Sequence, residues 1–304
     1  MEPKPTVLDL KKVLQSEVNM LFRHDRRLWN RPIVEVLQKL KNSGVQAVVF
    51  GGTLRSLLVS RLYHGRVGRP RDLDLVVTGI PFEDVEHHFR SLITRRTRFG
   101  GVQLKQDHWQ FDMWSVGDTW ALRKEGRGDA GFAALPSTTP FNLEAVAVEA
   151  WPQTGRVRQV FSGDEQFFEG VLTRTLELNR FDNPYPVLTT VRALVLASEL
   201  RFRVGPTLSK YIASTGSEFT VDELEHVQME HYGHLRMSGR TLQSFVAWVA
   251  DRSERHKAIQ LPNVGQLLLW HPETEEPRLR IHWSEGNSTS AERAVHEVLP
   301  STVH

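Results

Sequence analysis

Two aspartates at the start of an apolar run have a spacing that could bind a metal ion. Asp72 and Asp74 alternate with Leu73 and Leu75. Alternate residues of a β-strand point to the same face, so the two carboxylates are expected to project side by side. Carboxylates held together repel each other, and their oxygens are ligands that suit a hard divalent cation such as Mg²⁺. The spacing therefore predicts a metal site at the head of this strand.

A second feature, a pair of glycines, precedes these aspartates in the sequence. The apolar run 47–50 ends in Gly51 and Gly52, and a helix-like segment over 54–62 follows, carrying Arg55. Backbone N–H groups at a glycine turn that opens a helix can receive a phosphate, and an arginine can neutralise its charge. An anion-binding turn beside paired carboxylates predicts a site for metal-dependent nucleotidyl transfer.

Asp112 is the candidate for a third carboxylate. Phe111 and Met113 flank it in an alternation typical of a strand, whereas Asp107 and Asp118 lie in polar turns and are expected to be loop residues. The alternative interpretation is structural: the aspartates cap or face solvent and the glycines form an ordinary turn. The sequence that follows favours the catalytic interpretation.

These residues resemble the nucleotidyltransferase superfamily of polymerase-β type, and within it the class II branch of bacterial poly(A) polymerases and CCA-adding tRNA nucleotidyltransferases. That branch has a Gly-Gly-x-Val-Arg-Asp-x-Leu-Leu motif followed by Asp-x-Asp. The matching residues here are Gly51, Gly52, Leu54, Arg55, Leu57, Leu58, Asp72 and Asp74. Ser56 stands where the family has an aspartate and is expected to hydrogen-bond locally.

The resemblance continues along the chain in three further blocks. Residues 99–123 parallel the family's strand pair, which ends in an acidic residue and an arginine, here Asp112 and Arg123. Residues 140–176 parallel its next strand, glycine turn and helix, and residues 192–202 parallel its neck helix. Four blocks in the family's order cover residues 45–202.

The resemblance implies an α+β fold in three parts. A catalytic nucleotidyltransferase head with a mixed β-sheet and helices is expected over 1–160, and a mainly helical neck and body over 161–260. Residues 261–304 are expected to form a C-terminal β-hairpin, over 264–283, and a polar tail. Family members have a longer helical body that holds tRNA, and this chain has room for about one small helical domain after the neck.

The resemblance also implies the reaction and its residues. NMP would be transferred from an NTP to an RNA 3′ hydroxyl, most reasonably a tRNA acceptor end, with Mg²⁺ or Mn²⁺ as cofactor. Asp72, Asp74 and Asp112 would be the catalytic metal ligands. The nucleotide-binding residues would be Gly51, Gly52, Arg55, Arg123, Asp182 and Tyr185.

The neck departs from the family where the incoming base is read. The family has a Glu-Asp-x-x-Arg motif there, and this chain has Phe-Asp-Asn-Pro-Tyr-Pro over 181–186. Alignment on Asp182 puts Pro186 in the arginine position, and alignment on Arg192 puts Thr189 there. Because both alignments lack the base-reading arginine, we expect a relaxed or different nucleotide preference.

Composition sets the remaining limits. The net charge is +2, but residues 54–98 hold nine Arg against five Asp or Glu, which suits a polyphosphate or RNA backbone and equally suits a solvated surface. The chain has no cysteine, which excludes disulfides and thiolate chemistry. The sequence has neither a signal core nor a membrane-length apolar run, so we expect a cytoplasmic protein without membrane contact. The oligomeric state is left open.

Periodicity predicts the individual elements. Helices are expected over 7–22, 32–44, 81–93, 164–177, 186–201, 206–214, 220–232 and 238–257, a hairpin over 101–105 and 109–114, and a flexible loop over 124–137. His226, His231 and His234 are expected to be surface histidines, because only the last two have the helical spacing of metal ligands.

Two other functions stay open from the sequence. The first is a diverged transferase of toxin or defence type that modifies another hydroxyl on RNA or protein. The second is a non-catalytic nucleotide-binding or RNA-binding module, against which the retention of Asp72, Asp74 and Asp112 argues.

Overall fold

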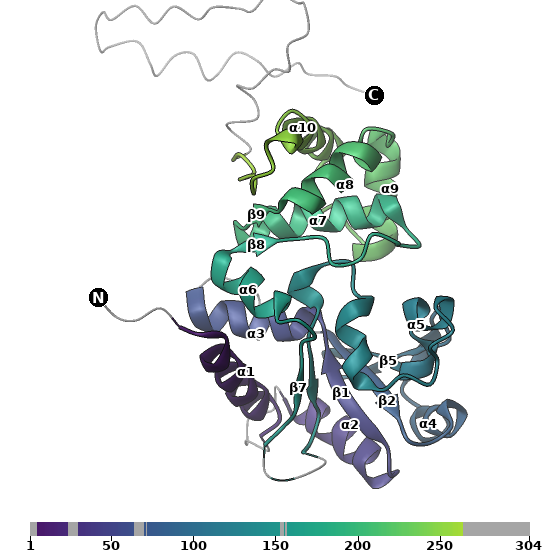
Figure 1. Ribbon diagram of the computed structural model, residues 1–304. Helices are drawn as coiled ribbons and strands as arrows, with labels where there is room; N and C mark the ends of the chain where they lie inside the picture. Colours follow the sequence, from purple (N-terminus) through teal and green to yellow (C-terminus); the bar gives the residue numbers. More distant parts are fainter. Residues whose placement is uncertain are drawn as a thin grey trace, which may run out of the picture. The chain divides into compact units, whose positions relative to one another are not determined.

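The computed structural model describes residues 5–23, 30–63, 70, 72–152, 155 and 157–263 (Figure 1). They belong to one compact unit within Met1–Trp270. The hairpin expected over 264–283 and the polar tail after it lie outside the described residues.

The chain begins with two amphipathic helices, α1 (Val7–Leu21) and α2 (Arg31–Asn42). The buried residues of α1 recur every three or four positions, as one helical face requires: Leu10, Leu14, Val18 and Leu21. Thr6 and Asp9 form a capping box that satisfies backbone N–H groups at the start of α1.

The strand, glycine turn, helix and second strand expected from the sequence are confirmed. They are β1 (Gln46–Phe50), α3 (Gly52–Tyr63) and β2 (Asp72–Thr78). Gly51 lies between β1 and α3 with φ +72°, in the left-handed region that favours glycine. β1 and β2 pair antiparallel, with Phe50 opposite Asp74. The turn after β1 and the head of β2 therefore meet at the same end of the sheet.

The next helix is shorter than expected. α4 (Phe82–Phe89) ends four residues before the expected end at 93, and Ile93–Arg96 forms strand β3 instead. Ile93, Arg95 and Arg96 pair with β4 (Val102–Gln106), with a register shift at Thr94, so strand pairing overrides the helical periodicity here. The hairpin of β4 and β5 (Trp109–Ser115) is confirmed.

The described strands form a mixed seven-stranded sheet in the order β3-β4-β5-β2-β1-β6-β7. β2 and β5 are parallel, and the other neighbouring pairs are antiparallel. The last two strands are β6 (Ala147–Glu149) and β7 (Val160–Phe161). With helices before, between and after these strands, the expected α+β class is confirmed.

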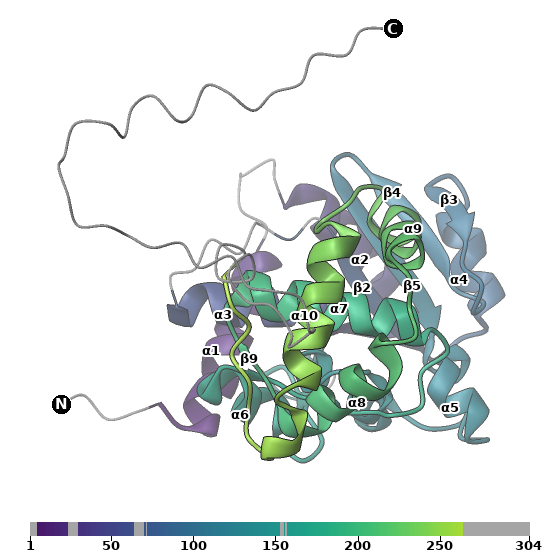
Figure 2. The ribbon, with the colours of Figure 1, turned by 90° about the horizontal axis from the view of Figure 1, so that it is seen from above.

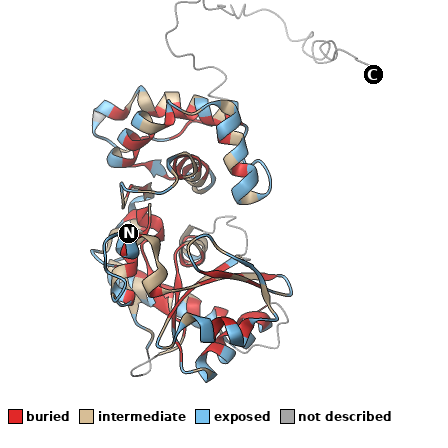
Figure 3. Ribbon diagram, turned by 90° about the vertical axis from the view of Figure 1, so that its right-hand side faces the viewer, coloured by how far each residue is buried: buried red, intermediate tan, exposed pale blue. Residues whose placement is uncertain are grey.

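The two faces of the sheet bury different clusters. Leu73, Leu75 and Val77 of β2 belong to the large core that also includes α1, α2 and α3. Val76 points to the opposite face and packs in a smaller cluster. Figure 3 shows the buried residues concentrated in the strands and the facing sides of the helices. Asp72 and Asp74 share their face with Val76. The carboxylates therefore lie next to the smaller apolar cluster, at the end of the sheet where β2 begins.

The prediction of a flexible loop over 124–137 is wrong for the second half of that range. After α5 (Trp120–Lys124), Phe132–Thr138 forms a 3₁₀ segment in which Phe132 and Leu135 are buried in the smaller cluster. The glycine and alanine content suggested a loop, but these two apolar side chains give the segment a reason to pack.

The rest of the described chain is mainly helical, as expected. Its helices are α6 (Gln166–Thr173), α7 (Pro186–Leu200), α8 (Pro206–Gly216), α9 (Val221–Tyr232) and α10 (Gly239–Ala250), with a 3₁₀ turn at Ser253–Arg255. The short parallel strands β8 (Thr175–Leu176) and β9 (Arg203–Val204) pair with each other. Contacts join α7 to each of α8, α9 and α10 (Figure 2).

One large core includes residues of α1, of α10 and of most helices and strands between them, so the sheet and the helices share buried contacts. The boundaries expected at 160 and 260 stay predictions. No helix in the described part of the chain combines the length and the apolar character needed to cross a membrane.

The alternation along β2 makes a prediction about stability. Leu73 is fully buried, so Leu73→Ala should lower the free energy of unfolding by about 2–5 kcal/mol. Asp72→Ala, one residue away on the exposed side, should change it by less than about 1 kcal/mol. Urea unfolding of both variants measures the difference, and equal losses would contradict the assigned facing of β2.

Candidate functional site

The three candidate carboxylates lie on one face of two adjacent strands. In the parallel register of β2 and β5, Asp74 is opposite Asp112 and Asp72 is opposite Gln110. Residues opposite each other in a pair of strands point to the same face. The expectation that Asp72 and Asp74 project together is met, and the strand order adds Asp112 to the same face.

Asp74 lies at the centre of a cluster of negative charge. Burial, followed by the charges of Asp112 and Glu144, raises the pKa of Asp74 to about 7 from an ordinary value of 3.8, and Asp72 adds to this. Arg192 acts in the opposite direction. The ionised form of Asp74 is therefore poorly compensated by the protein alone, and a bound cation would relieve that repulsion.

The donor set fits a hard divalent ion in ligand type, strand placement and charge. Carboxylate oxygens are the ligands that Mg²⁺ and Mn²⁺ prefer. Within the described residues, no group of three or more His, Cys, Asp or Glu side chains is already assembled as a metal centre. The Asp112 carboxylate instead accepts a hydrogen bond of 2.8 Å from the amide of Gln103. Asp72, Asp74 and Asp112 remain our candidates for metal ligands.

The glycine turn lies directly beside these carboxylates. A Cβ added to Gly51 would be 3.7 Å from Oδ2 of Asp74, and one added to Gly52 would be 3.5 Å from Nη2 of Arg55. The hydroxyl of Thr53 donates to the backbone oxygen of Asp72 at 2.6 Å and so ties the first turn of α3 to the head of β2. Gly51, Gly52 and Arg55 are thus brought together with the carboxylates.

Glu144 is a charged neighbour of this cluster that the sequence analysis missed. It is buried, and its Oε1 accepts hydrogen bonds from Arg55 at 3.1 Å and from Arg192 at 2.6 Å. Burial alone would raise the pKa of Glu144, but the two guanidinium groups hold it below its ordinary value. The result is a buried Arg–Glu–Arg triad that joins α3, the residues before β6, and α7.

The backbone around Glu144 is fixed by its neighbour Asn142. The Asn142 amide donates to the carbonyl of Thr175 at 3.1 Å and accepts from the N–H of Glu177 at 2.9 Å. A sequence signal for the triad did exist. Glu144 and Arg192 are each a lone charge in an apolar run, and charges in that setting are buried only when paired.

Other predicted residues have contacts away from the carboxylates. Arg123 is 60% exposed and forms an ion pair of 3.7 Å with Asp118. Asp107 is exposed in the turn between β4 and β5, with φ 52°, so both rejected aspartates are outside the cluster, as expected. Ser56 donates to the backbone oxygen of Gly52 at 3.0 Å, which confirms its expected local role.

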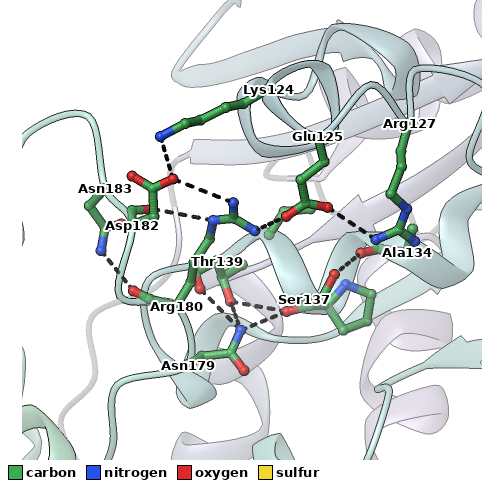
Figure 4. A network of polar contacts seen from close by, with 12 residues as sticks. Lys124, Glu125, Arg127, Ala134, Ser137, Thr139, Asn179, Arg180, Asp182 and Asn183 are labelled. Atoms are coloured by element: carbon green, nitrogen blue, oxygen red, sulfur yellow. Dashed lines mark hydrogen bonds and ion pairs between the residues drawn. The ribbon is translucent and has the colours of Figure 1, made fainter.

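Asp182 belongs to a network of polar contacts (Figure 4). It forms ion pairs with Lys124 and with Arg180, and Arg180 also binds Glu125 at 2.5 Å. The carboxylate of Asp182 is thus balanced by two cations. Its role in nucleotide binding stays a prediction, as does that of Arg123.

Tyr185 is the N-terminal flanking residue of α7 and contacts the segment between β3 and β4. Its hydroxyl accepts a hydrogen bond from Arg98, and its ring lies 6.2 Å from that of Phe99. Thr189, one of the two candidates for the missing arginine position, is buried and donates to the backbone oxygen of Tyr185. Thr189 has no long side chain to reach a base edge.

The end of α9 lies within electrostatic range of the triad. His231 keeps solvent contact, as expected of a surface histidine, yet surrounding protein and the charge of Arg192 lower its pKa to about 4. Burial, opposed in part by Arg192 and Arg236, raises the pKa of Tyr232. Their rings are 4.6 Å apart. Local sequence pattern does not indicate that this helix end approaches Arg192.

The raised pKa of Asp74 predicts how stability depends on pH. In the folded state the carboxyl group of Asp74 keeps its proton up to about pH 7, whereas in the unfolded chain it loses the proton near pH 3.8. The stabilising contribution of protonated Asp74 is therefore present at low pH and lost as the pH rises through 7. Asp74→Asn should be more stable than the wild type at pH 8 by about 2–4 kcal/mol, and this advantage should shrink toward pH 4.

Thermal or urea unfolding in the presence of a chelator measures this difference. Asp107→Asn, at the exposed turn position, is the matched control and should leave the pH profile unchanged. If Asp74→Asn is no more stable than the wild type at pH 8, Asp74 is not under the charge repulsion described here.

Comparisons with known proteins agree with this geometry at the level of the fold. No protein-family model matches the sequence, and no curated protein matches it either. The solved structures similar to this chain include a CCA-adding enzyme in complex with ATP, at 14% identity and a TM-score of 0.52, covering 78% of this chain and 54% of that one. Another is the Thermotoga maritima CCA-adding enzyme in complex with tRNA, at 14% identity and a TM-score of 0.52, covering 79% and 55%.

The chain therefore spans about half the length of the CCA-adding enzymes that it resembles. At this identity the likeness concerns the fold alone. The described part of the chain is similar in fold to these CCA-adding enzymes.

Proposed function

We propose that this protein is a metal-dependent nucleotidyltransferase that transfers NMP from an NTP to an RNA 3′ hydroxyl, most reasonably a tRNA acceptor end. One observation carries the proposal. Asp72, Asp74 and Asp112 share one face of two adjacent strands, beside a glycine turn that opens a helix. Mutual repulsion at Asp74 supports a cation as the missing partner of this cluster.

The proposed reaction forms one bond and breaks one. The hydroxyl oxygen of the acceptor attacks the α-phosphorus, the bond from that phosphorus to the β-phosphate oxygen breaks, and pyrophosphate leaves as the hydroxyl proton is lost. Mg²⁺ or Mn²⁺, held by Asp72, Asp74 and Asp112, would supply stabilisation of the charge on the attacking and leaving oxygens.

The chain's own groups would bind and orient the nucleotide. Gly51 and Gly52 have no side chains between the backbone and an incoming phosphate, and α3 begins at this turn with its N–H groups. Arg55 would add positive charge beside them. Arg123 is exposed on α5 and is the candidate for contact with more distant phosphates or with the RNA backbone.

Two observations support RNA as the acceptor: the likeness in fold to CCA-adding enzymes, and the excess of nine Arg over five Asp or Glu in residues 54–98. The similar structures contain CCA-adding enzymes with ATP or with tRNA. Because the chain spans about half their length, a tRNA acceptor is a proposal for this protein. A toxin or defence transferase that modifies another hydroxyl would use the same carboxylates, and the labelled product distinguishes the two.

The first functional prediction concerns the paired aspartates. Asp72→Ala and Asp74→Ala should each lower transfer by at least about 100-fold while the protein stays folded, because each removes a candidate metal ligand. The assay incubates the protein with each labelled NTP, Mg²⁺ or Mn²⁺ and total cellular RNA, and follows which molecule becomes labelled.

Asp107→Asn is again the control and should transfer at the wild-type rate. Metal-dependent transfer that survives in either alanine variant would mean that the metal site lies elsewhere. A wild type that labels nothing would favour the non-catalytic binding module. Asp112→Ala should reduce turnover more than NTP affinity, and normal turnover in that variant would remove Asp112 from the site.

The second functional prediction concerns base choice. Neither candidate position in the neck has an arginine. One is Pro186, which starts α7, and the other is Thr189, which is buried. A lost bidentate contact costs about 1–3 kcal/mol of discrimination. We expect single-nucleotide incorporation from the four NTPs, at equal concentration, to differ less than in a CCA-adding enzyme.

Residual preference is expected to depend on Asp182, Tyr185 or Arg192, and alanine variants of these residues test that dependence. Strict addition of two cytidines and one adenosine to truncated tRNA would contradict this prediction, because it would require a base-reading group other than the ones described.

A further inference from the structure

We propose that Glu144 is a positioning residue for the phosphates of the nucleotide. It holds Arg55 and Arg192 beside Asp74, where the two guanidinium groups contact the triphosphate. The inference rests on the proposed function, because it names the groups that receive the polyphosphate of the NTP.

The first support is the geometry of the triad. Both arginines donate to the same oxygen of Glu144, at 3.1 Å from Arg55 and 2.6 Å from Arg192. A guanidinium group has five N–H donors, so one shared acceptor leaves donors on both side chains for a further anion. Nε of Arg55 is buried and has no hydrogen-bond partner within the described part of the chain.

The second support is where the triad lies. A Cβ on Gly51 would be 3.7 Å from Oδ2 of Asp74 and 3.9 Å from the backbone oxygen of Glu144. Arg55 folds back beside Gly52, with Nη2 3.5 Å from the Cβ position there. The triad therefore borders both the glycine turn and the carboxylate cluster, which are the two parts of the proposed nucleotide site.

The third support is the balance of charge and exposure. Glu144 is 9% exposed at its side chain, Arg55 14% and Arg192 30%. The triad consists of one carboxylate and two guanidinium groups, so by itself it has a net charge of +1. Arg192 is its most exposed member. An oxygen-rich anion such as a polyphosphate is the ligand that this surplus and these planar donors suit.

A purely structural triad would behave differently. It would tie α3 to α7 and contribute to stability, but its loss would not distinguish nucleotides by their number of phosphates. A positioning role predicts that the effect depends on the triphosphate and passes through the arginines. Glu144→Gln is the sharpest variant, because it removes the charge and keeps the size and one oxygen acceptor.

The experiment measures the affinity of the full chain, with Mg²⁺ and without acceptor RNA, for each of the four NTPs and for the monophosphate of the same nucleoside. Glu144→Gln and Arg192→Gln should each weaken NTP binding by about tenfold and change NMP binding by less than about twofold. The double variant should lose less than the product of the two single losses, because Glu144 acts in part through Arg192 and in part through Arg55.

Glu165→Gln is the matched control. Glu165 forms an ion pair of 2.5 Å with Lys11, which joins α1 to the start of α6 at side-chain exposures of 29% and 34%. This variant also loses an ion pair between two elements, but its NTP affinity should equal that of the wild type. If Glu144→Gln does not fold, Arg192→Gln and Arg55→Gln carry the same comparison of NTP with NMP.

Three results would overturn the inference: wild-type NTP affinity in Glu144→Gln, equal losses for NTP and NMP, or losses that multiply in the double variant. Each leaves the proposed function standing if the wild type still transfers nucleotide. A wild type that binds none of the four NTPs would overturn both.

Discussion

Repulsion between carboxylates at the end of β2 is the constraint on which the rest of this site depends. Burial first, and then the charges of Asp112, Glu144 and Asp72, raise the pKa of Asp74 to about 7. The parallel pairing of β2 with β5 enforces this arrangement, because it sets Asp74 directly opposite Asp112. Burial of apolar side chains offsets the unfavourable free energy of these charges. On the other face of β2, Leu73 and Leu75 are fully buried. A cluster kept at such a cost is typical of a functional site.

Positive charge enters the same region from two separate elements. Arg55 comes from α3 and Arg192 from α7, and both are paired with Glu144. The helical segment is thereby linked to the carboxylate face of the sheet by charge as well as by packing. The neck residues that would read a base have other partners: Asp182 pairs with Lys124 and Tyr185 contacts Arg98. The positive charge that we propose for phosphate binding is present beside Asp74, whereas neither candidate neck position has the base-reading arginine of the proteins that this sequence resembles.

Short-range sequence pattern was enough to predict the turn, the strand and the hairpin that hold the candidate carboxylates. The turn at Gly51, the alternation in β2 and the hairpin that holds Asp112 follow from short-range periodicity and turn chemistry. Strand β3 was missed because its pairing with β4 outweighs the helical spacing of residues 81–93. The pairing of Glu144 with Arg192 was missed because 48 positions separate them in the sequence and only the packing of α7 brings them together. Their lone charges in apolar runs indicated burial but not the partner.

Binding of Mn²⁺ to the metal-stripped protein tests whether the carboxylates around Asp74 form a cation site. Calorimetric titration of the wild type and Asp74→Asn, each followed by a thermal melt with and without the ion, measures affinity and stabilisation together. Mn²⁺ should bind the wild type and raise its melting temperature, and both effects should be lost or strongly reduced in Asp74→Asn. Equal binding and equal stabilisation in the two proteins would contradict it, because the carboxylate cluster around Asp74 would then not be the cation site.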